Sequence, residues 1–209
     1  MSAVAFAITG ARAKPNAAAP TVSFDVSVTS PDRIEAMVLR AEIRIEPQWR
    51  DYDPQEQQLL DDMFGPPERW GTTLRTFSWA DVPLVVTGFQ DVTQTGIDVA
   101  CTYDFDVTAT RFFHALSHGD VPVRILFSGT IFYAGLQGFS CERVPWSAEA
   151  AYRMPASVWR DAMRACYGTD AVLRVKAETL ERLHKLRALS GALSWDELFE
   201  RFVATGEPT

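Results

Sequence analysis

The feature that most constrains the fold is a strict alternation of apolar and polar residues in the first part of the chain. Apolar side chains stand at every second position from 22 to 28. A second alternating run carries Met37, Leu39, Ala41, Ile43 and Ile45. Successive side chains of a strand point to opposite faces, so this period predicts strands with one buried and one solvated face. The turn at 30–32 is expected to separate the two strands.

Further strands are predicted at 4–9, 84–86, 97–107 and 121–134. The last is the strongest, because apolar residues occupy one face and Leu126 and Phe132 add apolar surface to the other. Strands that are apolar on both faces are typical of sheet centres. We therefore predict that 121–134 is a central strand, covered on both sides, with 97–107 as its partner.

A helix is predicted near 54–64. Asp53 can cap it, Pro54 suits the first helical position, and Glu56 follows the cap by three residues. This amphipathic helix is expected to lie on the sheet. The aromatic segment 70–79 is interpreted as an ordered loop. For 111–117 the pattern fits a helical turn and a continued strand equally well.

The C-terminal third changes character. Helical spacing predicts helices at 155–166 and 177–189 and from Ser194, where Ser194 and Glu197 form a capping box. A short strand is expected at 171–175. Because strands come first and helices later, the class is α+β. We predict an antiparallel β-sheet or sandwich body over 1–146, with the inserted helix, and a helical segment over 147–209 packed on it as one structural unit.

Charge and composition exclude several classes of protein. The net charge of −7 and only three lysines argue against a nucleic-acid partner. No apolar run approaches the ~20 residues of a membrane span, and the N-terminus lacks the core of a signal peptide. The three cysteines stand far apart, so they supply no zinc or redox pair. We expect a cytoplasmic protein without a cofactor.

No nucleotide-binding loop or nucleophile elbow occurs in the sequence. His114 and His118 stand four residues apart and would share a helix face, but no third metal ligand is signalled. Asp104 and Asp106 share a strand face, and with His114 they form a weak polar cluster that is interpreted as solvated surface. We therefore predict no catalytic, cofactor-binding or metal-binding residue.

Aromatic and arginine residues are the remaining candidates for contact with a partner. Trp49, Trp79 and Trp146 fall near predicted element ends, and Arg44 lies on a charged strand face. Tryptophan and arginine are enriched in the centres of protein interfaces. The competing interpretations are that the tryptophans cover core edges and that Arg44 takes part in cross-strand ion pairs.

Several segments resemble an uncharacterised protein family found mainly in GC-rich actinobacteria. They include CTYDF at 101–105, FHAL at 113–116, DVP at 120–122, LFSGT at 126–130 and VPW at 144–146. Genes of that family often lie beside those of uptake NiFe-hydrogenases and their maturation factors, so the resemblance implies an accessory, assembly or structural role. The sequence departs from the family at His118, where an acidic residue is expected. A fainter likeness to the SecB export chaperone implies, as an alternative fold, a SecB-like sheet plus helices.

The leading functional hypothesis is a non-enzymatic accessory protein that binds another protein, such as a hydrogenase subunit or maturation factor. The first alternative is a holdase-like chaperone with an apolar groove. The second is a metal-dependent enzyme that uses His114 and Asp104. The sequence leaves a homo-oligomer open.

Overall fold

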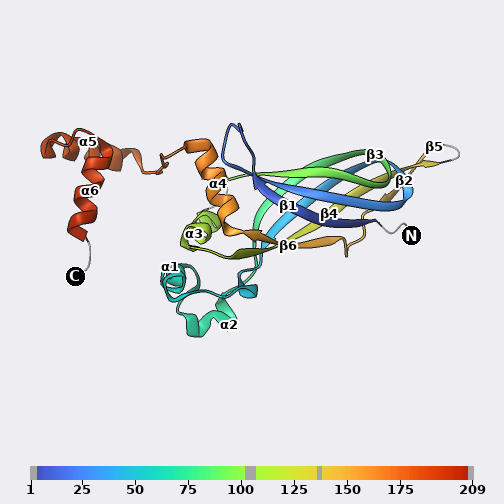
Figure 1. Ribbon diagram of the computed structural model, residues 1–209, viewed down its shortest axis with the longest axis horizontal. Coiled ribbons are helices and arrows are strands. Elements are labelled where there is room, and N and C mark those ends of the chain that lie inside the picture. The colour runs from blue at the N-terminus through green and yellow to red at the C-terminus, as the bar shows by residue number, and fades with distance from the viewer. Residues whose placement is uncertain (1–3, 102–106, 136–137, 207–209) are drawn as a thin grey trace. The chain divides into compact units, whose positions relative to one another are not determined.

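The computed structural model describes residues 4–101, 107–135 and 138–206. The chain divides into two compact units, 1–170 and 171–209, and the larger unit contains a curled antiparallel sheet (Figure 1). This confirms the α+β class. Within the described ranges, no helix combines the length and the apolar character that a bilayer crossing requires.

The sheet is organised around its second strand. Its strands are β1 (Ala5–Ala13), β2 (Thr21–Ile45), β3 (Phe77–Ala100), β4 (Asp120–Gly135), β5 (Gly138–Arg143) and β6 (Glu149–Pro155). β2 pairs with β1, β3 and β4, and β4 also pairs with β5 and β6. Every one of these pairings is antiparallel, so the expected strand orientation is confirmed.

The turn expected at 30–32 is a local irregularity inside one strand. The register of β2 against β3 shifts between Ser30 and Ile34, and the Ser30 hydroxyl donates to Asp32 O at 2.9 Å. Opposite this point, Asp91 of β3 has a φ of 64°. Pairing continues on both sides of the irregularity, so the two expected strands are one strand.

The predicted partner of β4 was wrong. Ile97 and Val99 lie in β3 and pair with Phe24 and Val22 of β2. β4 pairs with the later half of β2, where Ile43 lies opposite Ile125. Alternation shows which face of a strand is buried, but it carries no information about the neighbouring strand.

One face of the sheet forms the core. The inward residues of β2 are buried along its whole length, and Val123, Ile125 and Ile131 continue the core in β4. On the outer face, Leu126 and Phe132 are only half-buried. The expectation that β4 is covered on both sides was therefore wrong, because the outer face of β4 carries ion pairs such as Arg124–Glu46.

Helices α1 to α4 gather at one end of the sheet (Figure 1). They are α1 (Pro54–Phe64), α2 (Trp70–Thr73), α3 (Val107–Ala115) and α4 (Ala156–Tyr167), with short 3-10 turns at Pro47–Trp49 and Pro67–Arg69. Asp53 caps α1 by accepting from the Glu56 backbone N–H at 2.8 Å, as predicted. The loop expected at 70–79 is instead α2 followed by the start of β3. Phe113 of α3 stacks on Trp159 of α4 at 5.4 Å, which joins these two helices through their apolar faces.

The second unit contains α5 (Ala177–Ser190) and α6 (Trp195–Gly206). The cap expected at Ser194 is confirmed, because Glu197 N donates to the Ser194 hydroxyl. The Glu197 carboxylate accepts from Leu193 N, one residue before the Ser194 N–H of a full capping box. The strand expected at 171–175 does not form, and those residues have no regular structure. Residues 147–170, expected in the helical segment, form β6 and α4 within the first unit.

Gly129 provides a test of the β2–β4 pairing. Its φ is 138°, and a Cβ there would lie 2.1 Å from Val38 O. We expect Gly129→Ala to lower the free energy of unfolding by about 3 kcal/mol, through backbone strain and separation of the two strands. Urea unfolding measures the change. Gly71→Ala is the control, because nothing lies within 4 Å of its added methyl group; equal effects of the two variants would contradict the assignment.

Candidate functional site

The most enclosed charged group of the described chain is an ion pair at the start of α1. Arg50 follows the turn Pro47–Trp49, and Glu56 lies in the first turn of the helix. Their side chains are only 5% and 1% exposed, and Arg50 Nη2 lies 2.9 Å and 3.1 Å from the two Glu56 oxygens. Buried charges need close partners because desolvation costs several kcal/mol per ion.

The Arg50 guanidinium is held on several sides. Nε donates to Asp51 O at 3.2 Å, Nη2 donates to His118 O at 3.3 Å, and the group lies 4.7 Å from the centre of the Tyr52 ring. Nη1 is buried and has no hydrogen-bond partner among the described residues. A buried guanidinium N–H without an acceptor is uncommon and often marks a site that an additional group completes.

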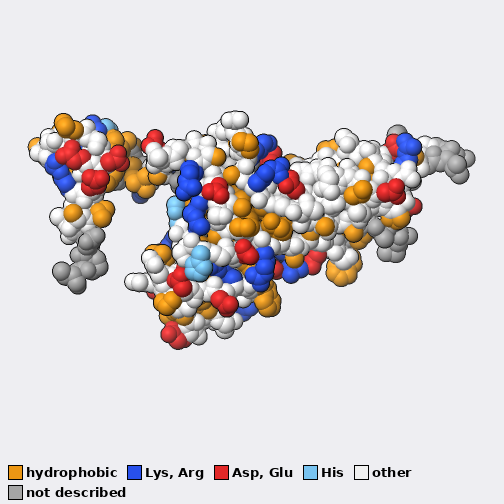
Figure 2. Space-filling view, viewed as in Figure 1, with side chains coloured by type: hydrophobic (Ala, Val, Ile, Leu, Met, Phe, Trp, Pro, Cys, Tyr) orange, Lys and Arg blue, Asp and Glu red, His pale blue; other side chains and the backbone are white. Residues whose placement is uncertain are grey.

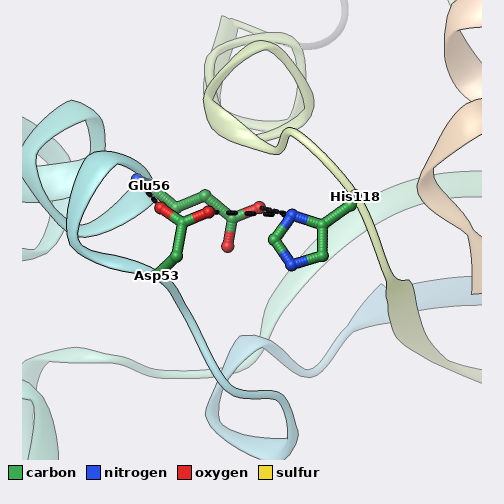
Figure 3. Close-up of side chains that lie close together, drawn as sticks. All are labelled: Asp53, Glu56 and His118. Carbon is green, nitrogen blue, oxygen red and sulfur yellow. Dashed lines mark hydrogen bonds and ion pairs between the residues drawn. The ribbon is translucent and has the colours of Figure 1, made fainter.

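The turn after α3 brings two more polar side chains to the pair. Ser117 N donates to Glu56 Oε1 at 2.9 Å, across 61 positions of sequence. The Ser117 hydroxyl lies 3.2 Å from Glu56 Oε1, 3.2 Å from Asp53 Oδ2 and 2.6 Å from His118 Nδ1. Figure 3 shows the Asp53 and Glu56 carboxylates and the His118 ring directed toward one another.

Hydrogen bonds and burial shift two pKa values here in opposite directions. The Glu56 backbone N–H lowers the pKa of the Asp53 carboxyl, and Ser117 and His118 act in the same direction. Burial raises the pKa of Tyr52, whose hydroxyl donates to Pro47 O at 2.8 Å. Asp53 is therefore an anion at neutral pH, and Tyr52 is a neutral donor.

The arrangement does not have the geometry of a Ser–His–Asp triad. In a triad, the serine and the carboxylate contact different nitrogens of the histidine ring. Here Ser117 Oγ and Asp53 Oδ2 both lie near His118 Nδ1, at 2.6 Å and 3.6 Å. The ligand atoms of Asp53, Glu56 and His118 do lie within 4.8 Å of one another, a spacing that suits a metal ion.

A cleft of about 350 Å³ adjoins the cluster, and Arg50, His118, Gly119, Trp49 and Arg153 are among its lining residues. Trp49 is 61% exposed, and Arg153 donates to its carbonyl at 3.2 Å. One of the predicted contact residues therefore lies beside the most enclosed charges of the chain.

The other predicted residues lie elsewhere. Trp79 is a core residue, 5% exposed and packed on Phe113, so as a surface contact it was wrong. Trp146 is 96% exposed beside a groove on the outer face of β4. Arg44 forms two hydrogen bonds with Glu42, at 2.7 Å and 2.9 Å. Both residues belong to β2, so this ion pair lies within one strand and is not the cross-strand pair that was expected.

Of the predicted polar cluster, only His114 lies within the described residues. Asp104 and Asp106 fall outside the described residues. His114 packs edge-on against Trp159 at 4.8 Å, whereas His118 lies beyond the end of α3, so the two histidines do not share a helix face. The cluster that His118 does join was missed, because Asp53 and Glu56 signal only a helix start and their contact with 117–118 is long-range.

Replacing Arg50 tests the buried pair. Arg50→Met leaves the Glu56 carboxylate buried without its counter-ion, and we expect a loss of about 3 to 5 kcal/mol in unfolding free energy. In the double variant with Glu56→Gln the buried charge is gone, and at least half of that loss should be recovered. Urea denaturation of the four proteins gives the coupling; a single-variant loss below about 1 kcal/mol would contradict the assignment.

His114 gives a test with pH. Burial lowers its pKa below the ordinary 6.5, so the unfolded chain binds this proton at a higher pH than the folded one. The stability that neutral His114 contributes is therefore complete above about pH 6.5 and is lost as the pH falls through the folded pKa. We expect the unfolding free energy of the wild type to fall more steeply between pH 7 and 5 than that of His114→Gln. An equal dependence of the unfolding free energy on pH in the two proteins would contradict this role of His114.

Comparison with known proteins gives a family but no activity. No curated protein matches the chain. Among solved structures, the beta-glucosidase of Kluyveromyces marxianus is similar at 6% identity and a TM-score of 0.29, covering 73% of this chain and 15% of that one. A mutant beta-glucosidase of Listeria innocua in complex with laminaribiose is similar at 6% identity and a TM-score of 0.26, covering 74% of this chain and 17% of that one. At such TM-scores, neither fold nor activity carries over. Over residues 1–209 the sequence matches a family of unknown function, DUF6084, and the chain belongs to that family.

Proposed function

We propose that the chain is a non-enzymatic accessory protein that binds another protein through the hairpin of α5 and α6. The observation that carries this proposal is the apolar surface of that hairpin. Its exposed large side chains are Leu180, Leu186, Leu189, Leu193, Phe199, Phe202 and Val203. Figure 2 shows hydrophobic side chains at the surface of this unit, between charged ones.

The two helices contact each other mainly through aromatic and polar groups. Arg187 lies 4.4 Å from the centre of the Trp195 ring, and His184 packs edge-on against the same ring at 4.9 Å. Arg201 donates to Ser190 O at 2.7 Å, which adds a polar link between the helices. These contacts leave Leu189 and Leu193 almost fully exposed.

A unit of this size buries too little apolar surface to be stable alone. Among its described residues, only Ala192 and Leu198 are buried. Units below ~40 residues usually need disulfides, metals or association to fold. A second protein surface over the hairpin would supply the missing burial.

The apolar residues of α6 have the spacing of a helix that docks in a groove. Phe199, Phe202 and Val203 stand at positions i, i+3 and i+4 of one helix face. Amphipathic helices bind hydrophobic grooves through such anchors. A NiFe-hydrogenase subunit or maturation factor is the partner that the family resemblance suggests, and a cytoplasmic location accords with it.

A holdase is the second candidate, and one groove favours it. This groove lies on the outer face of β4, and Leu126, Gly129, Val144 and the exposed Trp146 line it. Glu42 and Arg143 also line it, so the groove is less apolar than the hairpin. If an equimolar amount of the chain suppresses aggregation of an unfolded client protein, this result would favour the holdase over binding to one dedicated partner.

Site-specific cross-linking in the native host tests the proposal. A photo-reactive phenylalanine analogue replaces Leu193, which is 93% exposed on the hairpin, or Val85, which is 65% exposed on β3. We expect one hydrogenase subunit or maturation factor to be cross-linked from position 193 and not from 85. Cross-links from 193 to the chain's own first unit alone, or to a second copy, would contradict the proposal.

Charge substitution on the hairpin gives the matching loss of function. Leu189 and Leu193 are 86% and 93% exposed, so Leu189→Glu and Leu193→Glu should change the unfolding free energy by less than about 0.5 kcal/mol. Each should nevertheless reduce co-purification of the partner from the native host at least tenfold, because a buried carboxylate in the complex is unpaired. Val85→Glu is the control, and equal losses in all three variants would show that the hairpin is not the contact surface.

A further inference from the structure

We propose that the start of α1 and the turn after α3 form a binding site for one divalent transition-metal ion. The ligand atoms are Asp53 Oδ2, Glu56 Oε1 and His118 Nδ1, whose side chains Figure 3 shows, together with Ser117 Oγ. Two of the residues come from one helix end and two from a turn far along the sequence, so the fold brings the four atoms together.

The separations between these atoms are close to those of a coordination sphere. Ligands about 2.0 to 2.2 Å from an ion lie roughly 3 to 3.5 Å from one another. His118 Nδ1 lies 3.6 Å from Asp53 Oδ2 and 3.8 Å from Glu56 Oε1. Ser117 Oγ lies 3.2 Å from each carboxylate oxygen, and its 2.6 Å separation from His118 Nδ1 would lengthen when both bind the ion.

The Ser117 hydroxyl lies among more acceptor atoms than its single proton can serve. Carboxylate oxygens only accept hydrogen bonds, and the role of His118 Nδ1 depends on the tautomer of the ring. The Ser117 hydroxyl carries one proton, yet it faces Asp53, Glu56 and His118 at hydrogen-bond distance. A cation among these atoms would satisfy all of them.

Arg50 provides an independent observation that the site is incomplete. Its side chain is 95% buried, it lines the adjoining cleft together with His118, and its Nη1 has no partner in the described chain. A water or anion held by the ion at the cleft would offer the missing acceptor. Arg50 Nη2 also donates to both Glu56 carboxylate oxygens, at 3.1 Å and 2.9 Å, and so fixes the orientation of this ligand.

The ligand atoms select the class of ion. One imidazole nitrogen with carboxylate and hydroxyl oxygens suits Zn²⁺ or Mn²⁺, whereas Ca²⁺ and Mg²⁺ prefer oxygen alone. The positive charge of Arg50 opposes a cation, so the ion binds less tightly than it would to the same ligands without Arg50. His118 is 68% exposed, which leaves the ion an open path and free coordination positions.

Titration of the chelator-treated full chain with Zn²⁺ or Mn²⁺ alone tests the site. Calorimetry should show one Zn²⁺ per chain, and Zn²⁺ should shift the ring resonances of His118 more than those of His114. Absence of binding by both ions would overturn the proposal.

Two variants and one control locate the ion. His118→Gln removes the nitrogen ligand from an exposed position, and Asp53→Ser removes a carboxylate while keeping a side-chain oxygen to cap α1. Each should weaken Zn²⁺ binding by about 10 to 100-fold. His184→Gln should leave it unchanged. Wild-type affinity in both site variants, or an equal loss in His184→Gln, would overturn the assignment.

Discussion

Backbone hydrogen bonding along β2 is the constraint on which the rest of the sheet depends. The strand is 25 residues long, and each of its residues except Pro31 has a backbone donor and an acceptor that must find partners. β3 follows one edge of β2 through both halves, and β1 and β4 divide the other edge between them. β5 and β6 then pair with β4 and not with β2. The sheet is therefore built outward from β2, because the backbone groups of this strand need hydrogen-bond partners on both of its edges.

The Arg50–Glu56 pair has a comparable role among the helices. Glu56 belongs to the first turn of α1, accepts from the Ser117 backbone and binds a guanidinium that also bonds the His118 carbonyl. One carboxylate thus joins a helix start, a 3-10 turn and the loop that leads into β4. The low dielectric constant of this enclosed region strengthens each of these bonds and makes the loss of any one of them costly.

Local sequence patterns predicted the individual elements of this fold, but they did not predict which elements lie next to one another. The alternation in β2 and β4 identified the buried faces, and capping residues located the starts of α1 and α6. The partner of β4 and the continuity of β2 through 30–32 depend on pairing between distant segments, which no local period records. The same limit applies to the candidate site. Asp53 and Glu56 were predicted together as a helix start, but their contact with Ser117 and His118 arises from packing between distant segments. Nothing in the sequence indicated Arg50.

The outer edge of β3 has a consequence for behaviour at high concentration. Among the described strands, β3 pairs with β2 alone, and a long unpaired edge is a template on which other chains can add strands. Pro83 lacks the N–H that such a strand would need, and the positive φ of Asp91 interrupts the extended backbone. The irregularity at Asp91 therefore divides this 24-residue edge into shorter pieces, which makes edge-to-edge addition of another sheet less favourable.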